Sequence, residues 1–238
     1  MSAVRRFSTK SLKAAYPEVK RIIGSLLDED GLFPVLSKSQ KKRLAEKQPD
    51  DPTLPRRQAA VLVLLCSIDG NPSLLFTKRS ENMRQHAAEI SFPGGHVDAG
   101  DGSPIETALR ETTEELLPRD SCFLENIEIL ATATPLPALN GTPVTPVLAA
   151  FLPEISQPLS HHFPGDPGEV DTIFGVSVVD LLAEETVHEL PKNRMGLTQA
   201  PVFPSPHGNI WGLTAYILRP YLHQVLRPAF ELQGVAKV

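Results

Sequence analysis

A buried hairpin is the sequence feature that most constrains the fold. Residues 59–67 form a continuous apolar run, and residues 74–78 form a second, shorter one. The stretch Asp69-Gly70-Asn71-Pro72 between them contains the residue types that tight turns require. The sequence therefore predicts two paired strands inside a sheet core.

A helix is predicted at residues 104–117, where the glutamate-rich part of the chain lies. Ser103 is suited to the N-cap, Pro104 to the first turn, and Pro118 ends the helix. Further strands are expected at residues 127–134, 144–152, 172–176 and 200–203, and further helices at 178–184 and 211–226. We expect Trp211 to anchor the last helix in the core. Mixed strands and helices indicate an α/β sandwich.

The N-terminal residues have a composition of their own. The first 26 residues contain several Ser and Thr and one acid, Glu18, which is typical of a transit peptide. The basic residues in this segment are Arg5, Arg6, Lys10, Lys13, Lys20 and Arg21. Leu12, Tyr16, Val19, Ile23 and Leu26 recur at helical spacing, which equally favours a folded amphipathic helix. Prolines at 49, 52 and 55 indicate an extended connector, so we expect an N-terminal segment at 1–57 and a folded domain at 58–238.

Composition excludes several classes of protein. With 238 residues and 41% apolar content, the chain can bury an ordinary globular core. Its net charge of -5 gives no electrostatic basis for binding nucleic acid, and no apolar run reaches the roughly 20 residues that span a bilayer. Cys66 and Cys122 lack paired spacing, which suits a reducing compartment. We expect an intracellular location: cytoplasmic, mitochondrial or, since the last three residues loosely resemble a Ser-Lys-Leu signal, peroxisomal.

The residues best suited to chemistry are two glycines followed by three glutamates. Gly94 and Gly95 let a backbone approach phosphate closely or adopt positive φ. Glu111, Glu114 and Glu115 stand at i, i+3 and i+4, so they share one helix face. Alone they would suggest a solvated acidic surface. After the glycine loop they indicate a site for Mg²⁺ or Mn²⁺, which prefer carboxylate oxygens.

This stretch resembles the Nudix box, a pattern of one glycine, one glutamate, an Arg-Glu pair, a Glu-Glu pair and a final glycine at fixed spacing. The matching residues are Gly95, Arg110, Glu111, Glu114 and Glu115. Asp101 stands where the first glutamate is expected, with eight residues instead of seven before the arginine. Leu117 stands where the final glycine is expected.

The likeness extends to coenzyme A diphosphatases within the Nudix hydrolases. Residues 75–80 and 92–95 are similar to the motif that precedes the box in those enzymes, although Ala88 replaces a glycine of that motif. Residues 169–174 and 210–215 are similar as well. The resemblance implies a Nudix-type α/β/α sandwich with a mixed central sheet. It also implies hydrolysis of the diphosphate bond of coenzyme A or acyl-coenzyme A.

The resemblance implies roles for the acidic residues and for one arginine. Glu111, Glu114 and Glu115 would hold the metal, and Arg110 would orient Glu111. Glu111 is the first candidate for the catalytic base. Glu169 is a candidate from outside the box, and its competing interpretation is an ordinary surface acid.

A substrate-binding role is expected for cations and glycines close to the box in sequence. They are Lys78, Arg79, Arg84, Gly94 and Gly95. Each cation taken singly is also compatible with an ordinary solvated side chain. The expected partner is a small molecule, coenzyme A or a related nucleotide, bound by a monomer or homodimer. Two alternatives stay open: a substrate such as ADP-ribose or an oxidised nucleotide, and a catalytically silent Nudix-fold binding module.

Overall fold

The computed structural model describes residues 10–27, 58–81, 87–189 and 199–232. Its centre is an eight-stranded sheet. The strands are β1 (Ala59–Ile68), β2 (Asn71–Arg79), β3 (Ile90–Ser91), β4 (Gly94–His96), β5 (Ile127–Thr132), β6 (Leu136–Pro137), β7 (Pro143–Ile155) and β8 (Val170–Ser177). The main order is β3-β2-β1-β7-β5, with β8 paired to β2. Because β1 and β7 run parallel and the other pairs are antiparallel, the sheet is mixed.

The predicted hairpin is present as β1 and β2. Their register pairs Ile68 with Asn71, which leaves a two-residue turn. Both turn residues, Asp69 and Gly70, have positive φ, at 48° and 78°. This backbone matches the twist of a tight hairpin, and Asp and Gly are among the residues that adopt it most readily. The turn chemistry of the sequence thus sets the register of the sheet core.

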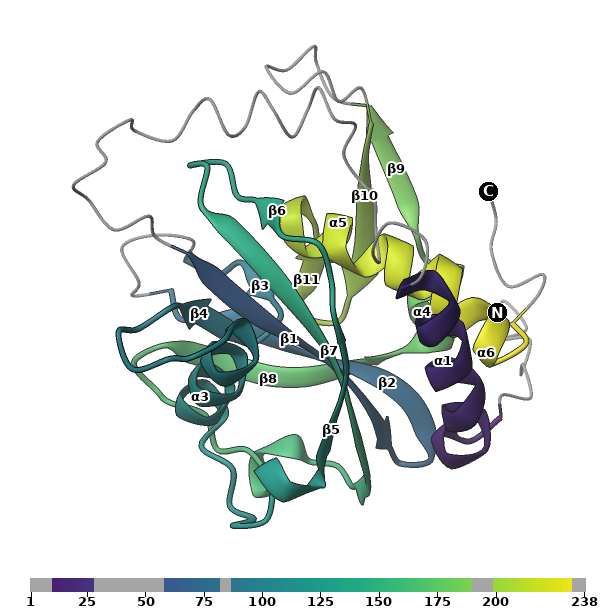
Figure 1. Ribbon diagram of the computed structural model, residues 1–238, viewed down its shortest axis with the longest axis horizontal. Helices are drawn as coiled ribbons and strands as arrows, with labels where there is room; N and C mark the ends of the chain where they lie inside the picture. The colour runs from purple at the N-terminus through teal and green to yellow at the C-terminus, as the bar shows by residue number, and fades with distance from the viewer. Residues whose placement is uncertain (1–9, 28–57, 82–86, 190–198, 233–238) are drawn as a thin grey trace.

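The strand β1 is buried on both faces, which explains its continuous apolar sequence. Leu62 and Leu64 belong to the core shared with α3 (Pro104–Leu116), whereas Val63 and Leu65 belong to the core on the opposite face. Helices on the opposite face are α1 (Leu12–Leu27), α4 (Val178–Ala183), α5 (Gly212–Tyr221), the π-helical turn η3 (Leu222–Leu226) and α6 (Arg227–Ala229). Figure 1 shows the sheet between these helices and α3. The predicted α/β/α sandwich is confirmed.

A small second sheet lies beside the C-terminal helices. It consists of β9 (Thr186–Glu189), β10 (Gln199–Ser205) and β11 (Gly208–Ile210) in the order β11-β10-β9. Two short 3-10 helices, η1 (Leu124–Asn126) and η2 (Leu159–His161), complete the described elements. Apart from β10, the predicted strand at 200–203, this sheet was not expected from the sequence.

The prediction that Trp211 anchors the last helix is wrong. Trp211 is 51% exposed. It is the N-cap residue of α5, with an extended backbone, and Gly212 follows it at a φ of 62°. The side chain therefore precedes the helix and lies outside its apolar face. The predicted helix is also divided: α5 contains Pro220, which has no N–H to donate, and a π-helical turn follows at Leu222.

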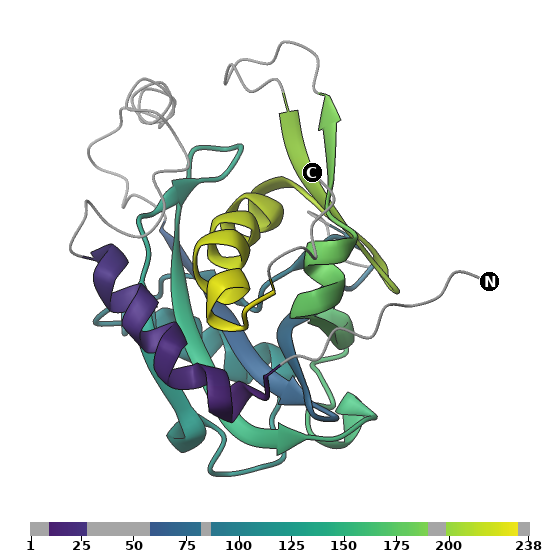
Figure 2. The ribbon, with the colours of Figure 1, turned by 90° about the vertical axis from the view of Figure 1, so that its right-hand side faces the viewer.

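The amphipathic helix predicted near the N-terminus is present as α1. Its buried residues are Leu12, Ala15, Val19, Ile22 and Ile23, which join the core formed by the C-terminal helices. Lys20 Nζ lies 2.6 Å from Glu128 Oε1 on β5, and Figure 2 shows α1 beside this strand. The connector with prolines 49, 52 and 55 and residues 1–9 lie outside the described residues. A targeting role and the boundary at residue 57 therefore stay predictions. In the described part of the chain, no helix is long and apolar enough to cross a membrane.

Candidate active site

The helix α3 is fixed at both ends by contacts local in sequence. Its N-cap residue Ser103 accepts a hydrogen bond from the Glu106 N–H at 3.2 Å. At the other end the backbone N–H of Leu117 bonds the Thr113 carbonyl, and Leu117 has a φ of 48°. A left-handed backbone costs a residue with a Cβ roughly 1 kcal/mol. Leu117 therefore adopts the conformation suited to the glycine that it replaces.

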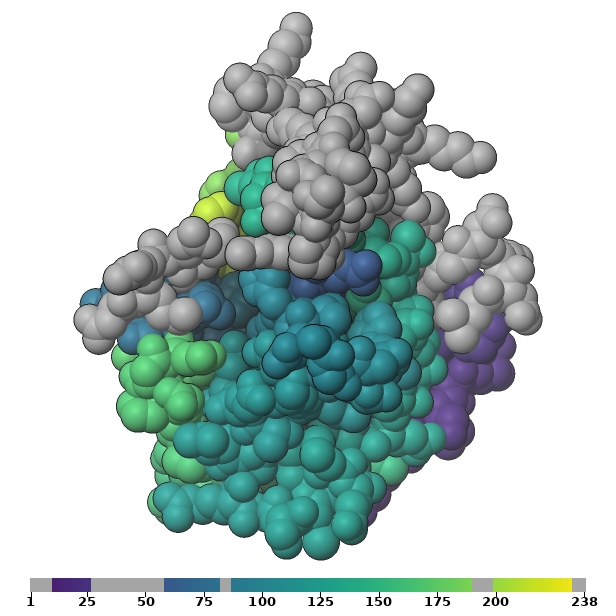
Figure 3. Space-filling view, turned by 60° about the vertical axis from the view of Figure 1, so that its left-hand side comes forward, coloured from purple at the N-terminus to yellow at the C-terminus, as the bar shows by residue number. Residues whose placement is uncertain are grey.

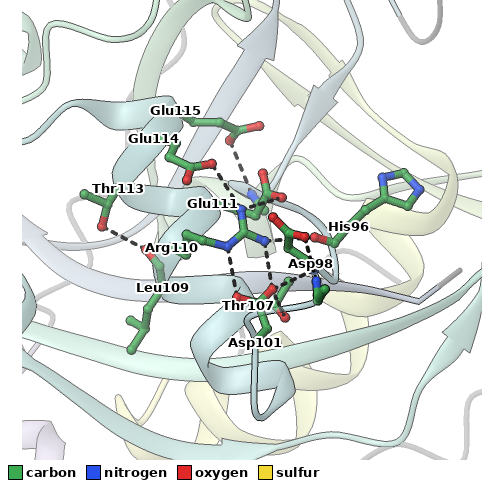
Figure 4. Close-up of polar contacts among 12 residues, drawn as sticks. His96, Asp98, Asp101, Thr107, Leu109, Arg110, Glu111, Thr113, Glu114 and Glu115 are labelled. Carbon is green, nitrogen blue, oxygen red and sulfur yellow. Dashed lines mark hydrogen bonds and ion pairs between the residues drawn. The ribbon is translucent and has the colours of Figure 1, made fainter.

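Arg110 uses all five of its N–H groups (Figure 4). Nε and Nη2 bond the two carboxylate oxygens of Asp101 at 3.0 and 2.8 Å, and Nη2 also bonds the carbonyl of His96 at 3.0 Å. Nη1 bonds Glu111 Oε1 and Glu114 Oε2, each at 3.1 Å. A guanidinium has five such donors, so this one is saturated. The contact between Arg110 and Glu111 has the geometry that an orienting role requires.

Asp101 is held by several donors. The Thr107 hydroxyl and the Asp98 N–H each donate to it at 2.9 Å, in addition to the two bonds from Arg110. The hydrogen bonds from Arg110, first of all, hold the pKa of Asp101 well below its usual range. Asp101 therefore reaches the arginine despite being shorter than glutamate and one residue further away in sequence. The role of Thr107 was not predicted from the sequence. Its hydroxyl reaches Asp101 only because the loop that contains Asp101 folds back over the first turn of α3.

Glu115 occupies a very different environment. Its side chain is 2% exposed, accepts a hydrogen bond from the Gly94 N–H at 3.3 Å, and lies 3.7 Å from Arg79 Nη1. Burial raises its pKa to about 8; Arg79 and the Gly94 N–H oppose this shift, and the charges of Glu169 and Glu111 add to it. The Nε of Arg79 is buried and has no hydrogen-bond partner among the residues that the structure describes. The ion pair of Arg79 and Glu115 therefore leaves a hydrogen-bond donor of Arg79 unused.

The two glycines of the preceding loop are required by contacts within the protein. Gly94 has a φ of 147°, and a Cβ there would overlap the backbone of Ala60 on β1. A Cβ on Gly95 would overlap the carboxylate of Glu111. The glycines thus let β4 approach β1 and let Glu111 lie against the loop. Burial raises the pKa of Glu111, while its ion pair with Arg110 acts in the opposite direction.

The loop before β8 brings Glu169 to the same region. The Ser80 N–H bonds the Glu169 carbonyl at 2.8 Å, and the Asp166 N–H bonds the Glu115 carbonyl at 2.9 Å. The negative charge of Glu169 contributes to the raised pKa values of both Glu111 and Glu115. In Figure 3 the green surface of this loop lies beside the blue-green surface around α3. Three carboxylates from two separate segments therefore share one electrostatic environment.

Two of the three cations expected to bind substrate lie at the end of β2. Arg79 faces Glu115, and Lys78 Nζ lies 3.7 Å from Asp171 Oδ2 on β8. Both side chains are partly buried, at 24% and 22% exposed. Arg84, the third cation, lies outside the described residues. Sequence gave no sign of the pairing between Lys78 and Asp171, because it depends on the register of two strands far apart in the chain.

The carboxylates of the site are the type of ligand that suits a hard divalent cation. Glu111, Glu115 and Glu169 present carboxylate oxygens, the ligands that Mg²⁺ and Mn²⁺ prefer. Burial first, and the neighbouring carboxylates to a smaller extent, raise the pKa values of Glu111 and Glu115. Glu114 is 59% exposed and therefore open to solvent. Among the described residues, no three acidic, His or Cys side chains converge at metal-binding distances. The Arg110 guanidinium lies between Glu111 and Glu114 instead.

Comparison with known proteins identifies the family. The family model described as NUDIX domain matches residues 56–195. A protein of Citrobacter koseri named Uncharacterized Nudix hydrolase NudL is 35% identical over 189 residues, covering 78% of this chain and 92% of that protein. Its namesake from Enterobacter sp. is 36% identical over 174 residues, covering 72% and 84%. A solved MutT/nudix family protein from Enterococcus faecalis aligns at 14% identity and a TM-score of 0.45, covering 83% of this chain and 71% of that chain. By its family match and its relatives, the chain belongs to the Nudix family and is a diphosphatase of the Nudix hydrolase type.

Proposed function

We propose that the protein hydrolyses the diphosphate bond of coenzyme A or acyl-coenzyme A, releasing 3′,5′-ADP and 4′-phosphopantetheine or its acylated form. One observation carries the substrate assignment. The segments that resemble coenzyme A diphosphatases, residues 75–80 and 92–95, contact Glu115 through Arg79 and the Gly94 N–H. The substrate-related part of the sequence and the glutamates thus form one site.

The proposed reaction is a displacement at phosphorus by water. The water oxygen bonds one of the two phosphorus atoms, and the bond from that phosphorus to the bridging oxygen breaks. The bridging oxygen leaves on the other phosphate, and a carboxylate takes the proton that the water loses. Glu111 is the proposed acceptor, because burial raises its pKa toward neutrality and makes it a better base. Glu169 is the second candidate, since its charge acts on the same region.

Glu111, Glu114 and Glu115 are proposed to hold Mg²⁺ or Mn²⁺. Either ion, when bound, would neutralise charge on the phosphate oxygens of the diphosphate. Arg110 is proposed to orient Glu111, since its remaining donors are fixed by Asp101 and a backbone carbonyl. A carboxylate held in this way needs little reorganisation when substrate binds.

Positive charge for the phosphates is proposed to come from Lys78, Arg79 and Arg84. The Arg79 side chain is 24% exposed and makes few hydrogen bonds among the described residues, so its accessible guanidinium donors are free to bond a phosphate oxygen. Gly94 and Gly95 are proposed to contribute to substrate binding through the loop backbone, which lies close to β1 and to the Glu111 carboxylate because neither residue has a Cβ. The 3′-phosphate of coenzyme A would add a charged group for one of the cations to recognise.

The test is a comparison of Mg²⁺-dependent hydrolysis of four compounds: coenzyme A, dephospho-coenzyme A, ADP-ribose and oxidised dGTP. We expect the highest kcat/KM for coenzyme A and a lower value for the dephospho form, because the latter lacks the 3′-phosphate. Chromatography of the products should show 3′,5′-ADP and 4′-phosphopantetheine. Activity confined to ADP-ribose and oxidised dGTP would overturn the assignment.

A further inference from the structure

A cavity of about 420 Å³ lies against β8, next to the candidate active site. Its walls are β8, the loop at residues 157–165 and the turn at residues 206–207 between β10 and β11. We propose that this cavity binds the neutral, amide-containing arm that coenzyme A carries beyond its diphosphate. This inference rests on the proposed function, and it places the neutral arm of coenzyme A in the cavity against β8.

The position of the cavity relative to the carboxylates supports this assignment. Asp171 lines the cavity and lies 3.7 Å from Lys78 Nζ, and the neighbour of Lys78, Arg79, faces Glu115. Strand residues advance about 3.3 Å each, so Asp171 and Phe174 lie roughly 3 and 13 Å along β8 from Val170, the residue that follows Glu169. A substrate whose diphosphate lies at the glutamates can therefore extend a chain along β8 into the cavity.

The charge of the cavity distinguishes the two ends of coenzyme A. Among the described residues that line it, the only carboxylate is that of Asp171, and none is a lysine or an arginine. A 3′-phosphorylated nucleotide placed there would meet negative charge without a cation in the wall, which is unfavourable in a partly desolvated site. A neutral arm carries no such penalty. The nucleotide end is thus expected on the other side of the diphosphate.

The chemistry of the walls suits an arm that alternates alkyl and amide groups. Phe163, Phe174 and His207 supply aromatic surface, and the rings of Phe174 and His207 have centroids 4.5 Å apart. Ser160 and Thr172 add hydroxyl groups. Polar and apolar surface contribute about equally to the lining. The amide groups and the alkyl groups of such an arm therefore each find a matching surface.

The strand itself offers a second kind of contact. Among the described strands β8 pairs only with β2, so the N–H and C=O groups on its other edge lack a ladder partner. Unpaired edge groups readily bond the amides of an extended chain laid beside them. Two amides in series, as in the arm of coenzyme A, match this repeating row of donors and acceptors.

The experiment fills the cavity with a bulky side chain. Ser160→Trp places an indole at an exposed position of the wall, and His207→Ala removes an exposed ring in a second, milder variant. Gln224→Trp is the matched control, because Gln224 is also exposed but lines a separate cavity between β10 and α5. Each variant is assayed on coenzyme A and on a truncated substrate, the methyl ester of 3′-phosphoadenosine 5′-diphosphate.

We expect the ratio of kcat/KM for coenzyme A to that for the truncated substrate to fall about tenfold or more in Ser160→Trp. It should fall about threefold in His207→Ala and stay within about twofold of the parent in Gln224→Trp. A parental ratio in both cavity variants, with coenzyme A still hydrolysed, would overturn the cavity assignment and leave the proposed function intact. If the parent hydrolyses neither compound, the proposed function itself fails. Thermal melting of each variant checks that the fold is kept.

Discussion

Two arginines next to the glutamates of α3 are used in opposite ways. Arg110 has an acceptor for each of its five N–H groups and holds Asp101, Glu111 and Glu114 together. Among the described residues, Arg79 has a buried Nε without a hydrogen-bond partner and one ion pair, at 3.7 Å, with the buried Glu115. A closed network is typical of scaffolding, whereas a buried group with unused capacity is typical of a place where a ligand binds. We therefore propose that the half of the site around Arg110 (the closed half) positions the carboxylates, whereas the half around Arg79 and Glu115 (the open half) receives the substrate.

The largest effect is expected for Glu115→Gln. The substitution keeps the shape and the bond from the Gly94 N–H but removes the charge that a cation needs. We expect kcat with Mg²⁺ and coenzyme A to fall on the order of a hundredfold or more. The matched control is Glu106→Gln, at an exposed position of the same helix, which should keep parental kcat. Equal losses in both variants would mean that the effect reflects overall charge and not the site.

Arg110→Lys tests the closed half. Lysine cannot reproduce the two parallel bonds to Asp101 while also reaching Glu111. We expect a lower melting temperature together with a loss of about tenfold to a hundredfold in kcat, because Glu111 is no longer held. Differential scanning calorimetry and steady-state kinetics measure the two effects. Unchanged values of both would refute the scaffolding role.

Arg79→Met tests the open half and should have a different signature. We expect KM for coenzyme A to rise about tenfold with little change in melting temperature, since the Arg79 side chain makes few bonds to the described part of the chain. Because Arg79 lowers the pKa of Glu115, the pH profile of activity should also shift to higher pH. A loss of stability as large as that in Arg110→Lys would erase the distinction between the two arginines.

The smallest effects are expected at the two positions where glycine is replaced. Ala88 and Leu117 are exposed and have φ values of 59° and 48°. Ala88→Gly and Leu117→Gly should each raise the free energy of unfolding by up to about 1 kcal/mol, because glycine removes the left-handed strain. Activity should stay at the parental level. A decrease in stability, measured by urea denaturation, would show that the lost side-chain contacts outweigh the strain.

The parts of the fold that were predicted correctly are those fixed by neighbours in sequence. The hairpin follows from the Asp69-Gly70 turn, and α3 from its Ser103 cap and Pro104. Positive φ at Ala88 could be anticipated, because the residue replaces a glycine. These features depend on local backbone chemistry, which a single sequence expresses directly.

The parts that sequence could not supply depend on long-range packing. The proximity of Glu169 to Glu111 and Glu115 requires the loop before β8 to bond both β2 and α3. The sequence indicated that something approaches Gly94 and Gly95 closely. Only the fold shows that the neighbour of Gly94 is the backbone of β1 and that the neighbour of Gly95 is the carboxylate of Glu111. Trp211 was placed in the core because large aromatic residues usually are, and its position just before α5 leaves it exposed.

The most direct test of the open half is a titration of the metal-free protein with Mn²⁺ at pH 7 in buffers of different ionisation enthalpy. With its pKa near 8, Glu115 is protonated at pH 7 and must lose that proton to bind a cation. The parent should therefore release close to one proton per Mn²⁺, and its affinity should rise about tenfold per pH unit until pH 8 and then level off. Glu115→Gln should bind weakly and release no proton. Parental affinity and proton release in Glu115→Gln would contradict the assignment of the metal to this buried carboxylate.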